Sequence, residues 1–149
     1  MSNPSESLRS LLDSIFSDVS MVLHAGDLTR ISILEAFAGK DVVAVCGNMD
    51  RHDVTQTLPV KEIINIHGHR IGLIHGWGSA KGVEARVRSE FQGVDAIVYG
   101  HTHKAVNRVK DGVLMFNPGA FSGTFPFGRN RSVGLLTIDD GICGSIVHL

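Results

Sequence analysis

Four short apolar runs in this chain each end in a glycine beside a side chain that can bind a metal ion. The runs end at Gly26-Asp27, Gly47-Asn48, His75-Gly76 and Gly100-His101-Thr102-His103. In an α/β protein the carboxyl ends of neighbouring strands meet at one edge of the sheet, where ligands bind. The pattern therefore predicts that one carboxylate, one amide and three imidazoles share a small volume and form a metal site.

The size and charge of the chain narrow its class. Its 149 residues fit one domain, 1–149, and carry 14 basic and 15 acidic side chains, a formal net charge of -1. This balance gives no electrostatic footprint for nucleic acid. Cys46 and Cys143 lack CxxC spacing, which favours reduced, buried thiols. With no stretch resembling a signal peptide or a membrane span, we expect a cytoplasmic protein without a membrane partner.

Strand-like and helical stretches alternate over the first hundred residues, which is typical of an α/β fold. The strands expected there are Met21 to Leu23, Val42 to Val45, Val60 to Ile66, Ile71 to Ile74 and Ala96 to Tyr99. Helices are expected from Pro4, near Ile31 to Ala38 and near Ala80 to Phe91. Short antiparallel strands follow, at Val106 to Val109, Leu114 to Phe116, Val133 to Ile138 and Ile142 to Val147. So many short runs predict two mixed sheets packed face to face, with helices outside.

The donor atoms at the strand ends suit a borderline divalent ion. Asp27 and Asn48 offer oxygens, while His75 and His101 offer nitrogens, and Mn²⁺ is our first choice, ahead of Zn²⁺, Fe²⁺ or Ni²⁺. His103 shares a face with His101, so it could bind a second ion bridged by Asp27. Paired metal ions clamp the attacking and leaving oxygens of a phosphoryl displacement. His24, just before Gly26-Asp27, is expected to anchor the loop by a hydrogen bond.

In their order, these motifs and Asn117-Pro118-Gly119 resemble those of the calcineurin-like metallophosphoesterases. The resemblance is greatest to the small single-domain bacterial and archaeal phosphodiesterases, to which the retromer small subunit is also similar. It implies a four-layer α-β-β-α sandwich and Mn²⁺-dependent hydrolysis of a small phosphoester. It also implies that Asp27 bridges two ions, with Asn48, His75 and His101 at the second and His103 at the first.

The family also begins with an apolar strand ending in Asp-x-His, and this chain has no such segment before its first expected helix. We therefore expect a fold that lacks its first strand and holds one metal ion or none. A start codon assigned at an internal methionine would explain the gap, and the alternative is a genuine loss of the strand. Loss of a buried strand leaves unpaired backbone edges, so we expect either a homo-oligomer that covers the gap or poor stability.

A second departure concerns the proton donor. Many larger relatives have a histidine directly after the Gly-Asn pair, where this chain has Met49. Asp27, Asn48 and Asp50 are the expected catalytic residues, although Asp50 could equally orient Arg51 or Asn48 from outside the metal shell. Asn48 and Arg129 are expected to contact the substrate phosphate, although the aromatic-rich loop before Arg129 could equally form a subunit contact.

Two functions follow from these motifs. The first is a metal-dependent phosphodiesterase, supported by the complete second ligand set. The second is a non-catalytic binding or scaffold protein with the same fold, supported by the missing Asp-x-His motif.

Overall fold

A computed structural model describes residues 4–28, 31–37, 39–47, 50–121 and 130–149 of the chain. Helices and strands alternate through the first two thirds, and the class is α/β as predicted. In chain order the elements are α1 (Pro4–Asp13), β1 (Met21–His24), the 3-10 helix η1 (Ile31–Phe37), β2 (Asp41–Ala44), α2 (His52–Thr57), β3 (Lys61–Ile66), β4 (His69–Ile74), α3 (Val83–Ser89), β5 (Ala96–Tyr99), β6 (Val106–Lys110), β7 (Val113–Asn117), β8 (Ser132–Ile138) and β9 (Ile142–His148). No helix among these residues is long and apolar enough to cross a membrane.

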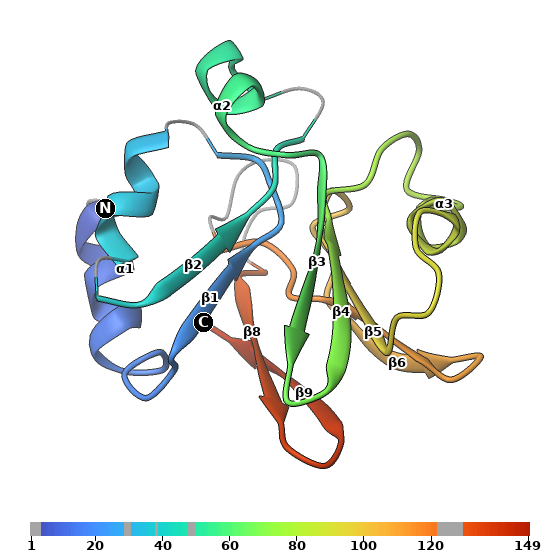
Figure 1. Cartoon of the computed structure of the whole chain (residues 1–149). Helices are drawn as coiled ribbons and strands as arrows, with labels where there is room; N and C mark the ends of the chain where they lie inside the picture. The colour runs from blue at the N-terminus through green and yellow to red at the C-terminus, as the bar shows by residue number, and fades with distance from the viewer. Residues whose placement is uncertain (1–3, 29–30, 38, 48–49, 122–129) are drawn as a thin grey trace.

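A five-stranded mixed sheet forms the centre of the molecule, in the order β3-β4-β5-β7-β6 (Figure 1). Its inner strands β4, β5 and β7 are parallel, and the edge strands β3 and β6 pair with them in antiparallel fashion. All four residues of β5 and all five of β7 are buried, as expected for strands covered on both faces. Their carboxyl ends therefore reach the surface at one edge, where polar side chains follow.

The remaining strands form a second layer of two separate ladders. β1 and β2 pair in parallel, and β8 and β9 pair as an antiparallel hairpin. Both ladders pack on one face of the central sheet, around a buried apolar cluster that includes Val98, Leu114 and Phe116. α3 lies on the opposite face, and α1 and η1 lie outside the β1-β2 ladder (Figure 1). The layers are those of the predicted sandwich, although the second sheet is divided in two.

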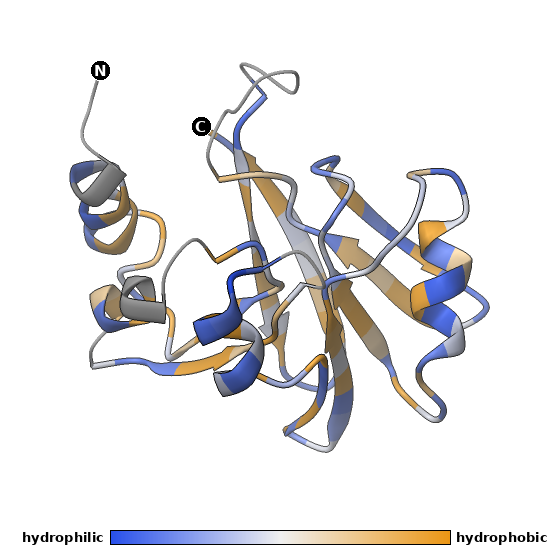
Figure 2. Ribbon diagram, turned by 90° about the horizontal axis from the view of Figure 1, so that it is seen from above, coloured by the Kyte–Doolittle hydropathy of each residue, from blue (hydrophilic) through white to orange (hydrophobic). Residues whose placement is uncertain are grey.

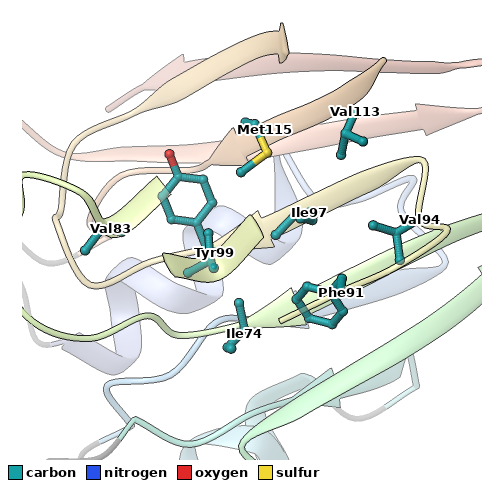
Figure 3. Packing of buried hydrophobic residues seen from close by; sticks show 9 residues of the cluster. Ile74, Val83, Phe91, Val94, Ile97, Tyr99, Val113 and Met115 are labelled. Carbon is teal, nitrogen blue, oxygen red and sulfur yellow. The ribbon is translucent and has the colours of Figure 1, made fainter. Parts of the chain in front are cut away.

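Apolar side chains fill the interface between α3 and the central sheet. Val83 and Val87 of α3 meet Ile97 and Tyr99 of β5, all nearly inaccessible to solvent (Figure 3). Strands of the central sheet are accordingly the most continuously hydrophobic part of the ribbon in Figure 2. Burial raises the pKa of the Tyr99 phenol to about 12, because the phenolate would lose its hydration.

Three short elements differ from the sequence prediction. The expected helix near 31–38 is a 3-10 helix that is followed by Gly39 with φ 90°, so the run is too short for a cooperative α-helix. α3 starts later than expected, because Gly82 directly before it has φ 88°. α2 was not predicted, since Val54 is its only buried side chain and it shows no apolar stripe.

The two cysteines differ in their surroundings. Both are free thiols, and Cys46 is buried as predicted, with its thiol donating to the Leu58 carbonyl at 3.4 Å. Cys143 is exposed, so its predicted burial was wrong. It lies in β9, where most of the strand alternates between half-buried and exposed residues, and its side chain falls on the exposed set.

Candidate metal and phosphoester site

The structure brings three of the predicted ligands together around one carboxylate. Asp27 follows β1, His75 follows β4, and His103 lies in the loop after β5. Asp27 Oδ1 is 3.3 Å from Nε2 of His75, and Asp27 Oδ2 is 3.2 Å from Nε2 of His103. The Asp27 side chain is 48% exposed, so this group is open to a ligand from solvent.

A hydrogen bond to the backbone sets the orientation of the His75 ring. Its Nδ1 lies 2.6 Å from the carbonyl oxygen of Ala25, and because a carbonyl can only accept, Nδ1 must carry the proton. In the neutral ring, Nε2 then presents a lone pair toward the Asp27 carboxylate, which is also an acceptor. Two acceptors at this distance need a cation between them, either a proton on Nε2 or a metal ion. With the proton the contact is an ion pair, and with a divalent ion the Ala25 carbonyl would be the outer partner of a ligating histidine.

Two of the predicted glycines make room for this ring. A Cβ atom at Gly26 would lie 2.6 Å from Nδ1 of His75, and one at Gly47 would lie 2.7 Å from its Cδ2. Gly26 also has φ 99°, a left-handed conformation that a side chain would strain. Glycine at the ends of the runs before Asp27 and Asn48 is thus required by the position of His75, which is only 5% exposed.

His101 is near this group but faces another partner. Its ring lies edge-on to His75, with centroids 5.3 Å apart, while its Nε2 is 2.7 Å from the carbonyl oxygen of Gly78. Nε2 must therefore donate, which leaves Nδ1 as the ring nitrogen that could bind a metal. His101 and His103 both have positive φ, 68° and 59°, so the loop that carries them is strained.

The remaining predicted site residues have mixed outcomes. Asn48 and Arg129 lie outside the described residues, so their roles stay predictions. Asp50 accepts a hydrogen bond from the backbone N–H of Gly47 at 2.8 Å, and its own N–H donates to the Gly47 carbonyl at 3.2 Å. This contact joins the two described residues on either side of 48–49, and the choice between the two roles of Asp50 stays a prediction.

Asn117 has a positioning role that the sequence did not assign. It is fully buried, and its side-chain amide donates to the Gly100 carbonyl at 3.0 Å and to the Thr102 hydroxyl at 3.1 Å. Its side-chain oxygen accepts from the Gly119 N–H at 3.0 Å. Asn117 therefore holds the loop that carries His101 and His103, and the available signal was a polar residue ending an apolar strand before Pro118-Gly119.

His24 anchors the Asp27 loop as predicted. The backbone N–H of Gly26 donates to Nδ1 of His24 at 3.2 Å. Burial lowers the pKa of His24, and the carboxylates of Asp50 and Asp27 oppose this only in part. A neutral His24 is what this contact requires, because a protonated Nδ1 could not accept a hydrogen bond.

The ligands do not form a closed metal cage. No group of three or more His, Cys, Asp or Glu side chains in the described ranges is arranged to hold a metal ion. Asp27 instead makes a hydrogen bond with His103 and lies at ion-pair distance from His75, and the described contacts of His101 are with Gly78 and His75.

Residues 5–141 match the profile of the calcineurin-like phosphoesterase superfamily domain. A probable metallophosphoesterase of Methanothermobacter thermautotrophicus is 39% identical over 127 residues, which cover 83% of this chain and 72% of that protein. A probable metallophosphoesterase of Methanocaldococcus jannaschii is 35% identical over 141 residues, which cover 90% of this chain and 69% of that protein.

Solved structures show the same fold. Vps29 of Entamoeba histolytica, in a complex with Zn²⁺, has a TM-score of 0.72 at 25% identity and covers 99% of this chain and 90% of its own. A novel archaeal phosphodiesterase has a TM-score of 0.75 at 22% identity, with 97% and 92% covered.

Proposed function

Because the chain belongs to the calcineurin-like phosphoesterase superfamily, we propose that it is a metal-dependent phosphodiesterase that hydrolyses a small phosphoester. The observation that carries the proposal is the Asp27 carboxylate between the Nε2 atoms of His75 and His103, at the carboxyl edge of the strands. Relatives named as probable metallophosphoesterases support the hydrolase class.

In this proposal Asp27, Asn48, His75, His101 and His103 hold the metal, with Mn²⁺ our first choice. Family membership supports a divalent ion, and Zn²⁺ is present in the Vps29 complex. When bound, such an ion polarises a phosphoryl oxygen and lowers the pKa of a water molecule. If two ions were bound, Asp27 would help to hold both.

The chain's own residues orient the reacting groups. The Ala25 carbonyl fixes the His75 ring, and Asn117 fixes the loop of His101 and His103. Asp50 accepts a hydrogen bond from the Gly47 N–H, and in our proposal it also takes part in proton transfer. Asn48 and Arg129 are proposed to bind the phosphate.

The test is Mn²⁺-dependent hydrolysis of bis(p-nitrophenyl) phosphate by the purified chain. Turnover should be lost in Asp27→Ala and in His75→Ala, and it should persist in His148→Ala, which removes an exposed histidine at the end of β9. Equal turnover in all four proteins would point to a contaminating phosphatase and would refute the proposal.

A scaffold protein is the second candidate. It is favoured by the likeness to Vps29 and by the lack of a closed metal cage among the described side chains. A chain that binds Mn²⁺ in calorimetry yet shows no turnover above Asp27→Ala would favour the scaffold. Turnover that depends on Asp27 would exclude it.

A further inference from the structure

One arginine binds the loop that connects β4 to α3 (Figure 1). Arg86 lies in the middle of α3, and its guanidinium donates to three backbone carbonyls of this loop. Nε donates to Trp77 O at 2.8 Å, Nη1 donates to Lys81 O at 3.4 Å, and Nη2 donates to Ser79 O. The planar guanidinium therefore binds every second carbonyl along the loop.

The exposed part of this loop has few other ties. Trp77 O and Ser79 O accept no further hydrogen bond from the described residues. The Trp77 ring packs against the apolar cluster beneath α3, but it anchors only the start of the loop. All residues from 78 to 82 are exposed to solvent. The path of the backbone between the tryptophan and α3 therefore depends on Arg86.

Two glycines make room for the guanidinium. A Cβ atom at Gly78 would lie 3.1 Å from Cζ of Arg86, and one at Gly82 would lie 3.0 Å from its Nη1. Both glycines also have positive φ, 81° and 88°, which a side chain would strain. The backbone of the loop thus fits closely around the Arg86 side chain.

The carbonyl between two of these contacts faces the candidate metal site. Gly78 O accepts a hydrogen bond from Nε2 of His101 at 2.7 Å. Its neighbours in the chain, Trp77 O and Ser79 O, are bound to Arg86. Because each peptide unit is planar, holding the units before and after Gly78 O leaves little freedom to the unit that carries it.

We propose that Arg86 is a positioning residue for the candidate metal site, and that it acts through Gly78 O on the ring of His101. Gly78 O holds the Nε2–H of His101, and Nδ1 stays open to a metal ion. The His101 backbone has φ 68°, a strained conformation that persists only where the surroundings hold it. The role in metal binding rests on the proposed function, whereas the contacts from Arg86 to His101 do not.

The chemistry of arginine suits this role. A guanidinium stays charged at every pH at which proteins fold, and its donors are arranged in a fixed planar fork. Among the described ion pairs, none joins Arg86 to a carboxylate, so its donors are available to the loop. A lysine has one ammonium group and cannot span three carbonyls. Arg86→Lys should therefore keep only part of the effect.

The first test is proton NMR of the imidazole N–H groups at pH 8, and it needs no metal. In the unmodified chain the Nε2–H of His101 should exchange with water at least about tenfold more slowly than that of His148, which is exposed. Arg86→Met should remove this protection. Arg88→Met is the matched control on the same helix, because Arg88 donates to Phe91 O at 3.2 Å, and it should keep the protection.

The second test is a calorimetric titration with Mn²⁺. Arg86→Met should lower the affinity by about three- to tenfold, less than loss of a group that touches a ligand directly. Arg86→Lys should have a smaller effect, and Arg88→Met should have none. In a His101→Ala background, Arg86→Met should cause no further loss, because the proposed action passes through that ring.

Three results would decide against the proposals. A His101 Nε2–H without protection in the unmodified chain would overturn the inference, even if Arg86→Met does not fold. An equal loss of Mn²⁺ affinity with and without His101 would also overturn it, since Arg86 would then act by another route. Absence of Mn²⁺ binding by the unmodified chain would refute the proposed metal site, and the NMR comparison would still decide whether Arg86 positions His101.

Discussion

At the residue scale, the contact between His75 and Asp27 carries most of the functional argument. The sequence predicted both residues at strand ends, because glycine and a polar side chain followed each apolar run. It could not predict that Ala25 O fixes the ring with Nε2 toward the carboxylate, since that depends on the path of the loop. Asn117 was missed for the same reason: its partners in the His101 loop lie 15 and 17 residues earlier in the chain.

Replacing the Asp27 carboxylate tests whether a cation is needed between Asp27 and His75. In Asp27→Asn, the new amide can donate to the lone pair of His75 Nε2, so no cation is needed. We expect unfolding free energy at pH 8 without metal to equal or exceed that of the parent, while Mn²⁺ affinity falls more than about tenfold. Urea unfolding and calorimetry measure the two quantities, and Asp53→Asn, at an exposed carboxylate, is the control. Unchanged Mn²⁺ affinity would remove Asp27 from the ligand set.

The lowered pKa of His24 leads us to expect that the stability of the fold depends on pH. Its folded pKa lies below its ordinary value of 6.5, so the unfolded chain binds a proton more readily. The stability from neutral His24 is fully present above pH 6.5 and is lost as pH falls through the folded pKa. Between pH 8 and 5, the free energy of unfolding measured in urea should fall less in His24→Asn than in the parent. The asparagine can still accept a hydrogen bond from the Gly26 N–H. His148→Asn should follow the parent, and an identical decline in all three would contradict the assignment.

At the element scale, apolar runs located the strands well. Strand bounds agree to within two residues, because buried runs bounded by glycine and turn residues have few alternatives. Elements whose bounds depend on the backbone conformation of one residue were harder to predict. The late start of α3 after Gly82 and the short η1 before Gly39 follow from positive φ angles, which no apolar pattern reports.

Gly26→Ala should lower the free energy of unfolding more than Gly39→Ala does. Both glycines have φ near 90°, but the added methyl group meets His75 only at position 26, and nothing lies within 4 Å at position 39. We expect Gly26→Ala to lose about 1–3 kcal/mol more unfolding free energy than Gly39→Ala. Urea denaturation gives both values. Equal losses would show that the glycine serves backbone conformation alone and does not make room for the ring.

At the scale of the whole molecule, the second layer is the least complete part of the fold. The family resemblance predicted a missing first strand, and the structure has two ladders where the sandwich would have one sheet. Whether the chain is a homo-oligomer stays a prediction. The central sheet was predictable because its strands are buried on both faces, whereas the division of the second layer depends on backbone groups that no residue pattern identifies.

Uneven stability is the expected consequence. Amides of β5 and β7 should exchange slowest, and edge-strand amides that point away from their ladder, among them those of Met21, Leu23, Gly134 and Leu136, should exchange faster, because they have no described ladder partner. Residue-resolved hydrogen exchange of the isolated chain measures this. Protection of these amides equal to that of β5 and β7 would contradict the division of the second layer into two ladders.

We propose that Asp27, His75 and His103 belong to one metal centre. To test this, the purified chain is titrated with Mn²⁺, and the concentration of free Mn²⁺ is measured at each step by its electron paramagnetic resonance signal. We expect saturable binding that is lost in His75→Ala and retained in His148→Ala. Absence of saturable binding, or equal binding in both variants, would contradict it.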